Sequence, residues 1–224
     1  MKKAIGCVFA FAIVLGGCTS KTDPNKKNFS AALDQYFAKR GELCLGQASW
    51  PVEITALEAR LDKDLRNGLT GRMVALESVG LVKSTEAEKP SFDHSGKPTG
   101  DTYKVTSYSL TETSKPFQRE VKDSVGLNLS GKPILPRTDL CWGRKQLAEV
   151  VKWEGPMKLG DNQVATVHYR YKLDSVAEWA NRPEVITAFP AIAREMVGAE
   201  GHLSEYGVVL TSEGWEAKGL DSDL

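Results

Sequence analysis

Histidine and cysteine are scarce in this chain of 224 residues, which has only three histidines and four cysteines. A zinc site needs several of these ligands at close spacing, so we expect no metal site. An excess of one charge is also lacking, since 29 basic residues balance 29 acidic ones. Nucleic-acid-binding domains normally carry a clustered basic surface, so we expect no nucleic-acid partner.

Motifs of catalysis are lacking as well. The chain has no Gly-x-Ser-x-Gly elbow to present a serine nucleophile, and no glycine-rich loop follows a predicted strand to bind phosphate. Asp93, His94 and Ser95 are triad residue types, but contiguous residues in a loop rich in Pro and Gly do not normally converge. His168 lies on the predicted solvent side of a strand, and His202 lies in a predicted loop. We therefore predict no catalytic residue, no cofactor and no enzymatic activity.

One apolar run is present, at residues 4–15, directly after Lys2 and Lys3. It is shorter than the roughly 20 apolar residues that a membrane-spanning helix needs. A positive start followed by a short apolar run is typical of a secretory signal peptide, which we assign to residues 1–17.

Leu15-Gly16-Gly17-Cys18 ends this run and resembles the lipobox of bacterial lipoproteins. The resemblance implies cleavage before Cys18 and attachment of lipid to its sulfur. Thr19, in place of an aspartate, implies sorting to the outer membrane. The expected location is the bacterial cell envelope, lipid-anchored and facing the periplasm. A plain cleaved signal with an incidental Cys18, or an uncleaved anchor, is the alternative.

Only Cys44 and Cys141 then remain, because Cys7 leaves with the signal. An oxidising periplasm permits a disulfide between them, which would close a loop of almost a hundred residues and stabilise the fold by about 4 kcal/mol. Two buried free thiols are the other reading.

The mature chain has about 200 residues, enough for one large domain or two small ones. We predict an α+β protein with a lipidated cysteine and tether at 18–28 and an N-terminal α+β domain at 29–130. A C-terminal α+β domain, an antiparallel sheet with a helical block, is predicted at 131–224. The boundary falls where glycine and proline become frequent and periodicity is lost.

Four local patterns support these domains. A helix is expected at 29–40 with Ser30 as its cap, and another at 57–66, where leucine recurs every fourth residue among charges that face water. Residues 165–173 alternate as a strand buried on one face. The last pattern is a helical stripe interrupted by Pro190, formed by Val185, Phe189, Ile192 and Met196.

Residues 70–82 resemble the recognition helix and first wing strand of winged-helix proteins of the MarR kind, and residues 108–112 resemble the returning strand. The segment between them, 83–101, has the Ser, Pro, Gly and charge content of a wing loop. The resemblance covers residues 55–115 and implies that Arg72 lies near a DNA groove. Because the expected location excludes a genome, we interpret it as reuse of the fold for protein contact. An ordinary helix and hairpin is the alternative.

These features together predict a binding or interaction module held at the membrane by its N-terminal lipid, with an envelope protein as partner. The alternative is a lipid-tethered envelope hydrolase whose site carries no recognised motif.

Overall fold

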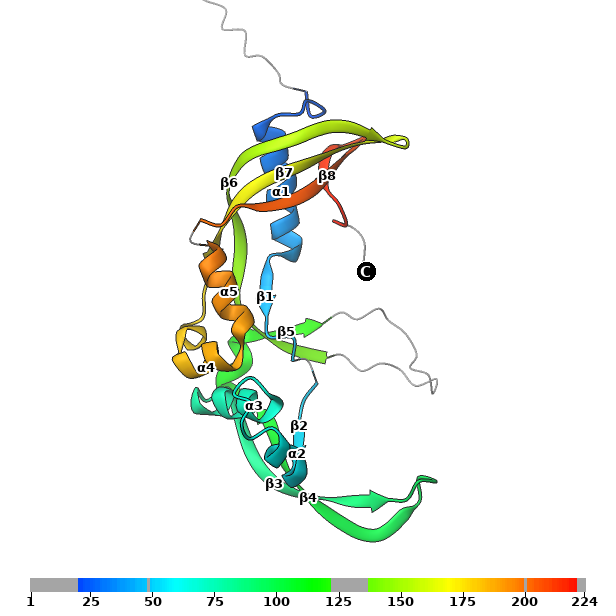
Figure 1. Cartoon of the computed structure of the whole chain (residues 1–224), viewed down its shortest axis with the longest axis vertical. Helices are drawn as coiled ribbons and strands as arrows, with labels where there is room; N and C mark the ends of the chain where they lie inside the picture. Colours follow the sequence, from blue (N-terminus) through cyan, green and yellow to red (C-terminus); the bar gives the residue numbers. More distant parts are fainter. Residues whose placement is uncertain (1–19, 48, 122–136, 200, 221–224) are drawn as a thin grey trace, which may run out of the picture.

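The computed structural model describes residues 20–47, 49–121, 137–199 and 201–220. Cys18 and the predicted signal peptide lie outside these ranges. The described part is elongated: helix α1 (Lys26–Arg40) lies at one end, and the hairpin of β3 (Val82–Phe92) and β4 (Pro98–Leu110) lies at the other (Figure 1). Its helices and antiparallel sheets make it an α+β protein, as predicted.

One end is built from α1 packed on an antiparallel sheet of order β1-β6-β7-β8-β9, with β5 also paired to β6. Its strands are β1 (Glu42–Cys44), β5 (Gln118–Val121), β6 (Arg137–Leu159), β7 (Asn162–Asp174), β8 (Ser204–Thr211) and β9 (Gly214–Ala217). Strand β6 is 23 residues long, and its two halves have different neighbours: β1 and β5 pair with the first part, and β7 pairs from Arg144 onward. This strand runs from the α1 end to the middle of the molecule (Figure 1) and contributes to both hydrophobic cores, through Trp142 to one and Val150 to the other.

The other end has a three-stranded sheet of order β2-β4-β3, with two helices between β2 and β3 in the sequence. The elements added here are β2 (Val52–Thr55), α2 (Ala56–Leu61) and α3 (Leu69–Ser78). Between the two ends lie η1 (Glu112–Phe117), η2 (Glu178–Asn181), α4 (Pro183–Ala188) and α5 (Pro190–Ala199). No helix among the described residues is both long and apolar enough to cross a membrane.

Two hydrophobic cores hold these elements together, and each takes residues from both halves of the sequence. One joins α3, β2 and β4 to Trp142, Trp179 and Ile192. The second joins α1 to Val167 and Trp215 of the main sheet. The predicted domain boundary at 130/131 itself falls within residues 122–136, outside the described ranges.

A disulfide joins strands β1 and β6 in the middle of the molecule. Cys44 of β1 lies opposite Cys141 of β6, and a disulfide joins them. Beside them Asp139, which is 6% exposed, accepts hydrogen bonds from the backbone N–H groups of Gly46, Gln47 and Leu140. Three donors satisfy this buried carboxylate, so the chain after β1 is fixed to β6.

Several predicted elements are confirmed. Strand β7 buries Ala165, Val167, Tyr169 and Tyr171 while the residues between them are less buried. The helical stripe is also confirmed: Val185, Phe189 and Ile192 are buried, Met196 packs against the same core, and the helix breaks at Pro190 as expected.

Other expectations were wrong in detail. The first helix begins at Lys26, not Phe29, because Asn25 rather than Ser30 caps it by accepting from the backbone N–H of Asn28. Residues 83–92 are strand, not loop, because β3 continues to pair with β4 as far as Phe92. The loop expected over 83–101 therefore shrinks to the turn between the two strands.

Candidate functional site

Large apolar side chains are exposed in a row over α2, the turn after it, and α3. We call them the leucine surface: Leu57 (53% exposed), Leu61 (73%), Leu65 (56%), Leu69 (39%) and Val74 (52%). The sequence predicted that the charged side of this helix faces water and thus that its leucines turn inward, which was wrong. None of the six residues of α2 is buried, because the core below is already filled by Ile54, Met73 and Leu76.

The backbone under the leucine surface is held by local hydrogen bonds. Thr55 and Glu58 form a reciprocal capping box at the start of α2. The backbone N–H and the hydroxyl of Thr55 donate to Glu58 and lower the pKa of its carboxyl. The carboxylate of Asp62 accepts from the backbone N–H of Thr70 at 2.7 Å, which ties the turn to the first residues of α3. The exposed leucines therefore stand on an ordered scaffold.

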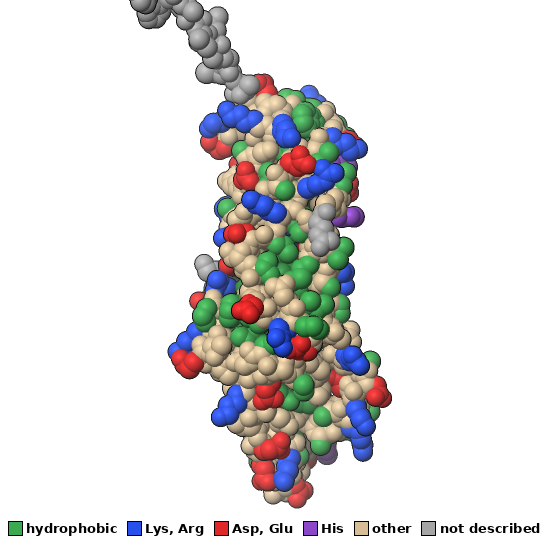
Figure 2. Space-filling view, turned by 90° about the vertical axis from the view of Figure 1, so that its left-hand side faces the viewer, with side chains coloured by type: hydrophobic (Ala, Val, Ile, Leu, Met, Phe, Trp, Pro, Cys, Tyr) green, Lys and Arg blue, Asp and Glu red, His purple; other side chains and the backbone are tan. Residues whose placement is uncertain are grey.

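A groove of about 640 Å³ runs beside these leucines, between α3 and the start of α4. Leu65, Val74 and Ala75 form its apolar wall, and Pro183 and Thr187 lie opposite them. A shallower hollow of about 340 Å³ adjoins it through Leu65 and is lined also by Leu61 and Leu69. The two hollows share Asp62, Leu65 and Thr70 and are therefore adjacent. Above them, Figure 2 shows hydrophobic side chains gathered over the middle of the face that carries α4 and α5.

The charged side chains at the rim of this groove differ in whether they have partners. Glu184 is bound by Arg182 at 3.2 Å, and Asp62 is bound by the backbone of Thr70. Lys63 and Arg66 also line the groove, and within the described residues neither has a hydrogen-bond or ion-pair partner. Lys63 and Arg66 are therefore two cations that a ligand can neutralise, next to the Asp62 carboxylate, whose charge the backbone N–H does not cancel.

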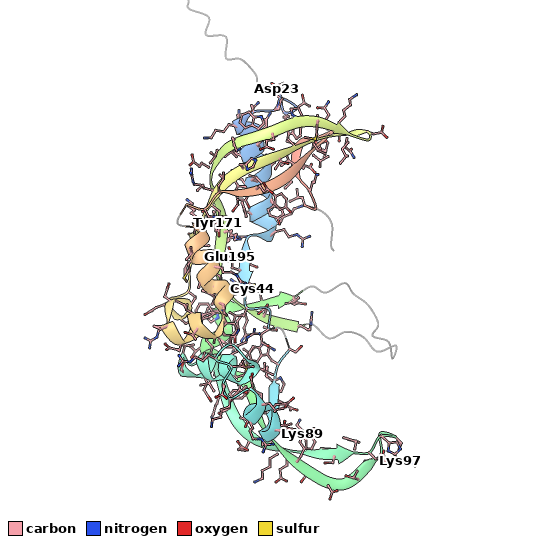
Figure 3. The ribbon with its side chains drawn as sticks, viewed as in Figure 1. Asp23, Cys44, Lys89, Lys97, Tyr171 and Glu195 are labelled. Carbon is pink, nitrogen blue, oxygen red and sulfur yellow. A yellow bond between two sulfur atoms is a disulfide. The ribbon has the colours of Figure 1, made fainter. Side chains whose placement is uncertain are left out.

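A second, more polar groove lies where α5 crosses the main sheet. The ammonium of Lys145 is 2.6 Å from Glu195, and the Tyr171 hydroxyl donates to the same carboxylate at 2.9 Å, as the labelled side chains in Figure 3 show for Tyr171 and Glu195. Burial and this hydrogen bond raise the pKa of the Tyr171 phenol above its usual range. His202 and Ser204 line the same groove.

This groove does not have the geometry of nucleophilic catalysis. Glu195 is engaged by Lys145 and Tyr171, so its carboxylate is not left to orient a histidine. A triad needs the base to contact both nucleophile and acid, whereas within the described part of the chain His202 makes no side-chain hydrogen bond to either. The contacts instead fasten α5 to β7.

The other chemistry-bearing residues lie apart from each other. Asp93 is in the turn of the β3–β4 hairpin, where hydrogen bonds from Ser95 and the backbone of Lys97 lower its pKa; it has no contact there with His94. His168 lies on the outer side of β7, 3.1 Å from Glu154 and 3.9 Å from Glu205. Across the described ranges no three His, Cys, Asp or Glu residues are grouped as metal ligands.

Comparison with known proteins adds no assignment: no family model matches the sequence, and neither the curated proteins nor the solved structures give a match. Of the predicted site residues, Cys18 lies outside the described ranges, while Cys44 and Cys141 are joined. The leucine surface had a signal in the sequence, the leucine repeat of 57–65. That repeat identifies one helical face but not whether another element covers it.

Proposed function

We propose that this protein is a lipoprotein of the bacterial envelope that binds an apolar, acidic segment of a partner protein through the leucine surface. The observation that carries the proposal is the exposure of four leucines and a valine on an ordered scaffold, beside a groove that is also lined by Lys63 and Arg66, which have no ion-pair partner among the described residues. Large contiguous apolar patches of this kind are typical of interaction sites.

Lipidation of Cys18 would place the fold very close to the membrane. Residues 20–25, expected to be part of a free tether, are bound to the fold: the Trp215 indole donates to the backbone oxygen of Thr22 at 3.0 Å. The Asn28 side chain donates to the backbone oxygens of Ser20 and Asp23. An acyl chain on Cys18 would therefore be only two residues from the first bound position. The leucine surface lies toward the opposite end of the molecule (Figure 1), so it would be presented away from the bilayer.

The chemistry of the partner follows from the groove. A leucine that is fully buried on binding contributes roughly 1.5–3 kcal/mol, so half-exposed leucines contribute about 1 kcal/mol each. Lys63 and Arg66 at the rim favour acidic residues next to the apolar ones and disfavour a basic partner. We therefore infer a protein segment with apolar side chains flanked by Asp or Glu.

We also propose that residues 52–110 are a winged-helix-like unit used for protein contact. The order β2-α2-α3-β3-β4 and the sheet order β2-β4-β3 are what that fold requires. A DNA-reading role is not supported, because α3 packs against α4 and the Arg72 guanidinium lies over the Phe189 ring, 5.7 Å from its centre. The Arg72 side chain therefore lies toward the α4–α5 junction of its own chain and not on an open helix face that could enter a DNA groove.

Anchoring is tested by fractionating cells that carry the parent or Cys18→Ser. We expect the parent to be recovered with outer membranes and to incorporate labelled palmitate, and Cys18→Ser to be released by osmotic shock. Recovery of the variant with membranes to the same extent as the parent would contradict the lipid anchor.

Docking is tested by placing a photo-crosslinking residue at Val74 in cells, with a matched probe at Val151 of β6, which is 41% exposed far from the leucine surface. We expect the Val74 probe to capture a peptide with apolar residues and flanking Asp or Glu. Leu65→Ser and Lys63→Glu should each lower the yield, by about fivefold for the leucine. Equal capture of the same peptide by the Val151 probe, or capture that is insensitive to Leu65→Ser, would refute the docking surface.

A further inference from the structure

A small pocket of about 240 Å³ lies between the start of α3, the first turn of α5 and the end of β1. Two arginines line it, Arg72 from α3 and Arg194 from α5, together with the side-chain amide of Asn67. No acidic residue is among its lining residues. The pocket is therefore positively charged, unlike the polar groove nearby, where Lys145 neutralises Glu195.

Neither arginine is neutralised elsewhere. Within the described residues, the side chains of Arg72 and Arg194 have no ion pair and no hydrogen bond. The Nε of Arg72 is buried without an acceptor, and its guanidinium lies over the Phe189 ring, 5.7 Å from the ring centre. A partly buried cation without a counter-charge is costly, so a bound anion would stabilise this arrangement.

The other walls of the pocket are apolar, which favours a ligand with an apolar part. Trp142, Phe189 and Ile192 line the pocket and are 3%, 5% and 1% exposed, so they give it a rigid apolar side. Pro190 and Ala191, in the first turn of the ten-residue helix α5, form another wall. Pro190 has no backbone N–H and that of Ile192 donates to the backbone oxygen of Phe189, so the attraction for an anion comes from the two guanidinium groups.

We propose that this pocket binds a small organic oxyanion, a phosphate or carboxylate on a compact apolar body. The guanidinium groups are planar and present paired N–H donors that match two oxygens of either group. The oxyanion lies between Arg72 and Arg194, and its apolar part lies against Trp142 and Ile192. Cys44, labelled in Figure 3, is at the edge of the same pocket, so its disulfide with Cys141 holds β1 in the position that completes the wall.

The test is calorimetric titration of the mature protein in non-ionic detergent with phenyl phosphate, with benzoate, and with phenol as the uncharged control. We expect dissociation constants of about 1 mM or tighter for at least one anion and none measurable for phenol. The dissociation constants of phenyl phosphate and benzoate are compared to decide which oxyanion the pocket prefers. Titration with inorganic phosphate shows whether the apolar part of the ligand is needed.

Arg72→Gln and Arg194→Gln should each weaken binding about tenfold or more, since each removes charged hydrogen bonds. Arg194 is exposed, so its variant is expected to fold normally even if Arg72→Gln does not. Arg182→Gln is the matched control, because Arg182 lies outside the pocket and pairs with Glu184. The proposal fails if no anion binds, if phenol binds equally well, or if Arg194→Gln behaves like the control. The anion-binding proposal is independent of the proposed partner at the leucine surface, so a failure of the crosslinking test would not contradict it.

Discussion

Phe29 of α1 should be the most sensitive position at the end of the fold that contains α1. Its side chain is 0% exposed and its ring packs against two tryptophans, with centroids 5.3 Å from Trp153 and 5.0 Å from Trp215. Phe29→Ala removes the ring that joins the helix to strands β6 and β9. A buried Phe→Ala change costs about 3–5 kcal/mol, because lost burial and the remaining cavity both contribute. Phe29→Leu, which fills more of the cavity, should cost less.

The measurement is urea unfolding followed by tryptophan fluorescence, because Trp153 and Trp215 report directly on the site. The matched control is Phe92→Ala, since Phe92 is 59% exposed in the distal hairpin and should change stability by no more than about 0.5 kcal/mol. In thermal unfolding, the loss at Phe29 should lower the midpoint by on the order of 10 °C for a chain of this size. Equal losses for Phe29→Ala and Phe92→Ala, or a loss below about 1 kcal/mol at Phe29, would refute the packing argument.

Two other predictions concern the disulfide and the titration of the Tyr206 phenol. Alkylation of the purified protein without reductant should label neither Cys44 nor Cys141, and two labelled thiols in the mass spectrum would rule the bond out. The Cys44→Ser/Cys141→Ser double variant should lose about 4–5 kcal/mol of unfolding free energy, because the bond closes a loop with a sequence separation of 97. Burial, with a smaller contribution from the neighbouring Tyr36 phenol, raises the pKa of Tyr206 from 10.0 to about 12, so the folded state holds this proton where the unfolded state loses it, and stability should fall as pH rises from 10 to 12. Tyr206→Phe should show a shallower fall of the urea midpoint over that range, and an identical slope would contradict the assignment.

Strand β7 and the stripe of α4 and α5 were predictable because their patterns depend only on local geometry. Alternating residues in a strand face opposite sides, so Val167 and Tyr169 could be placed in a core before that core was known. A proline in the middle of a helical stripe ends one helix and can begin the next, because it lacks the backbone donor that the preceding turn needs, so the break at Pro190 could be placed. The predicted address at Cys18 is likewise a property of a short linear motif and needs no fold.

The burial of the leucines at 57–65 could not be predicted from their spacing. Their spacing defines one face of a helix, but whether the face is buried depends on what packs on it, and Met73 and Leu76 from α3 had already filled that core. The same holds for the boundaries of the cores: α1 packs on strands more than a hundred residues later, and Trp179 joins the core of α3.

The sequence by itself determined the α+β class, the main amphipathic elements and the motif on which the expected address rests, because each depends on residues that are neighbours along the chain. Only the tertiary structure decided that the leucines are exposed, that Cys44 meets Cys141, and that Arg72 and Arg194 share one pocket. Those contacts join residues far apart in the sequence, and long-range packing, not local periodicity, sets them.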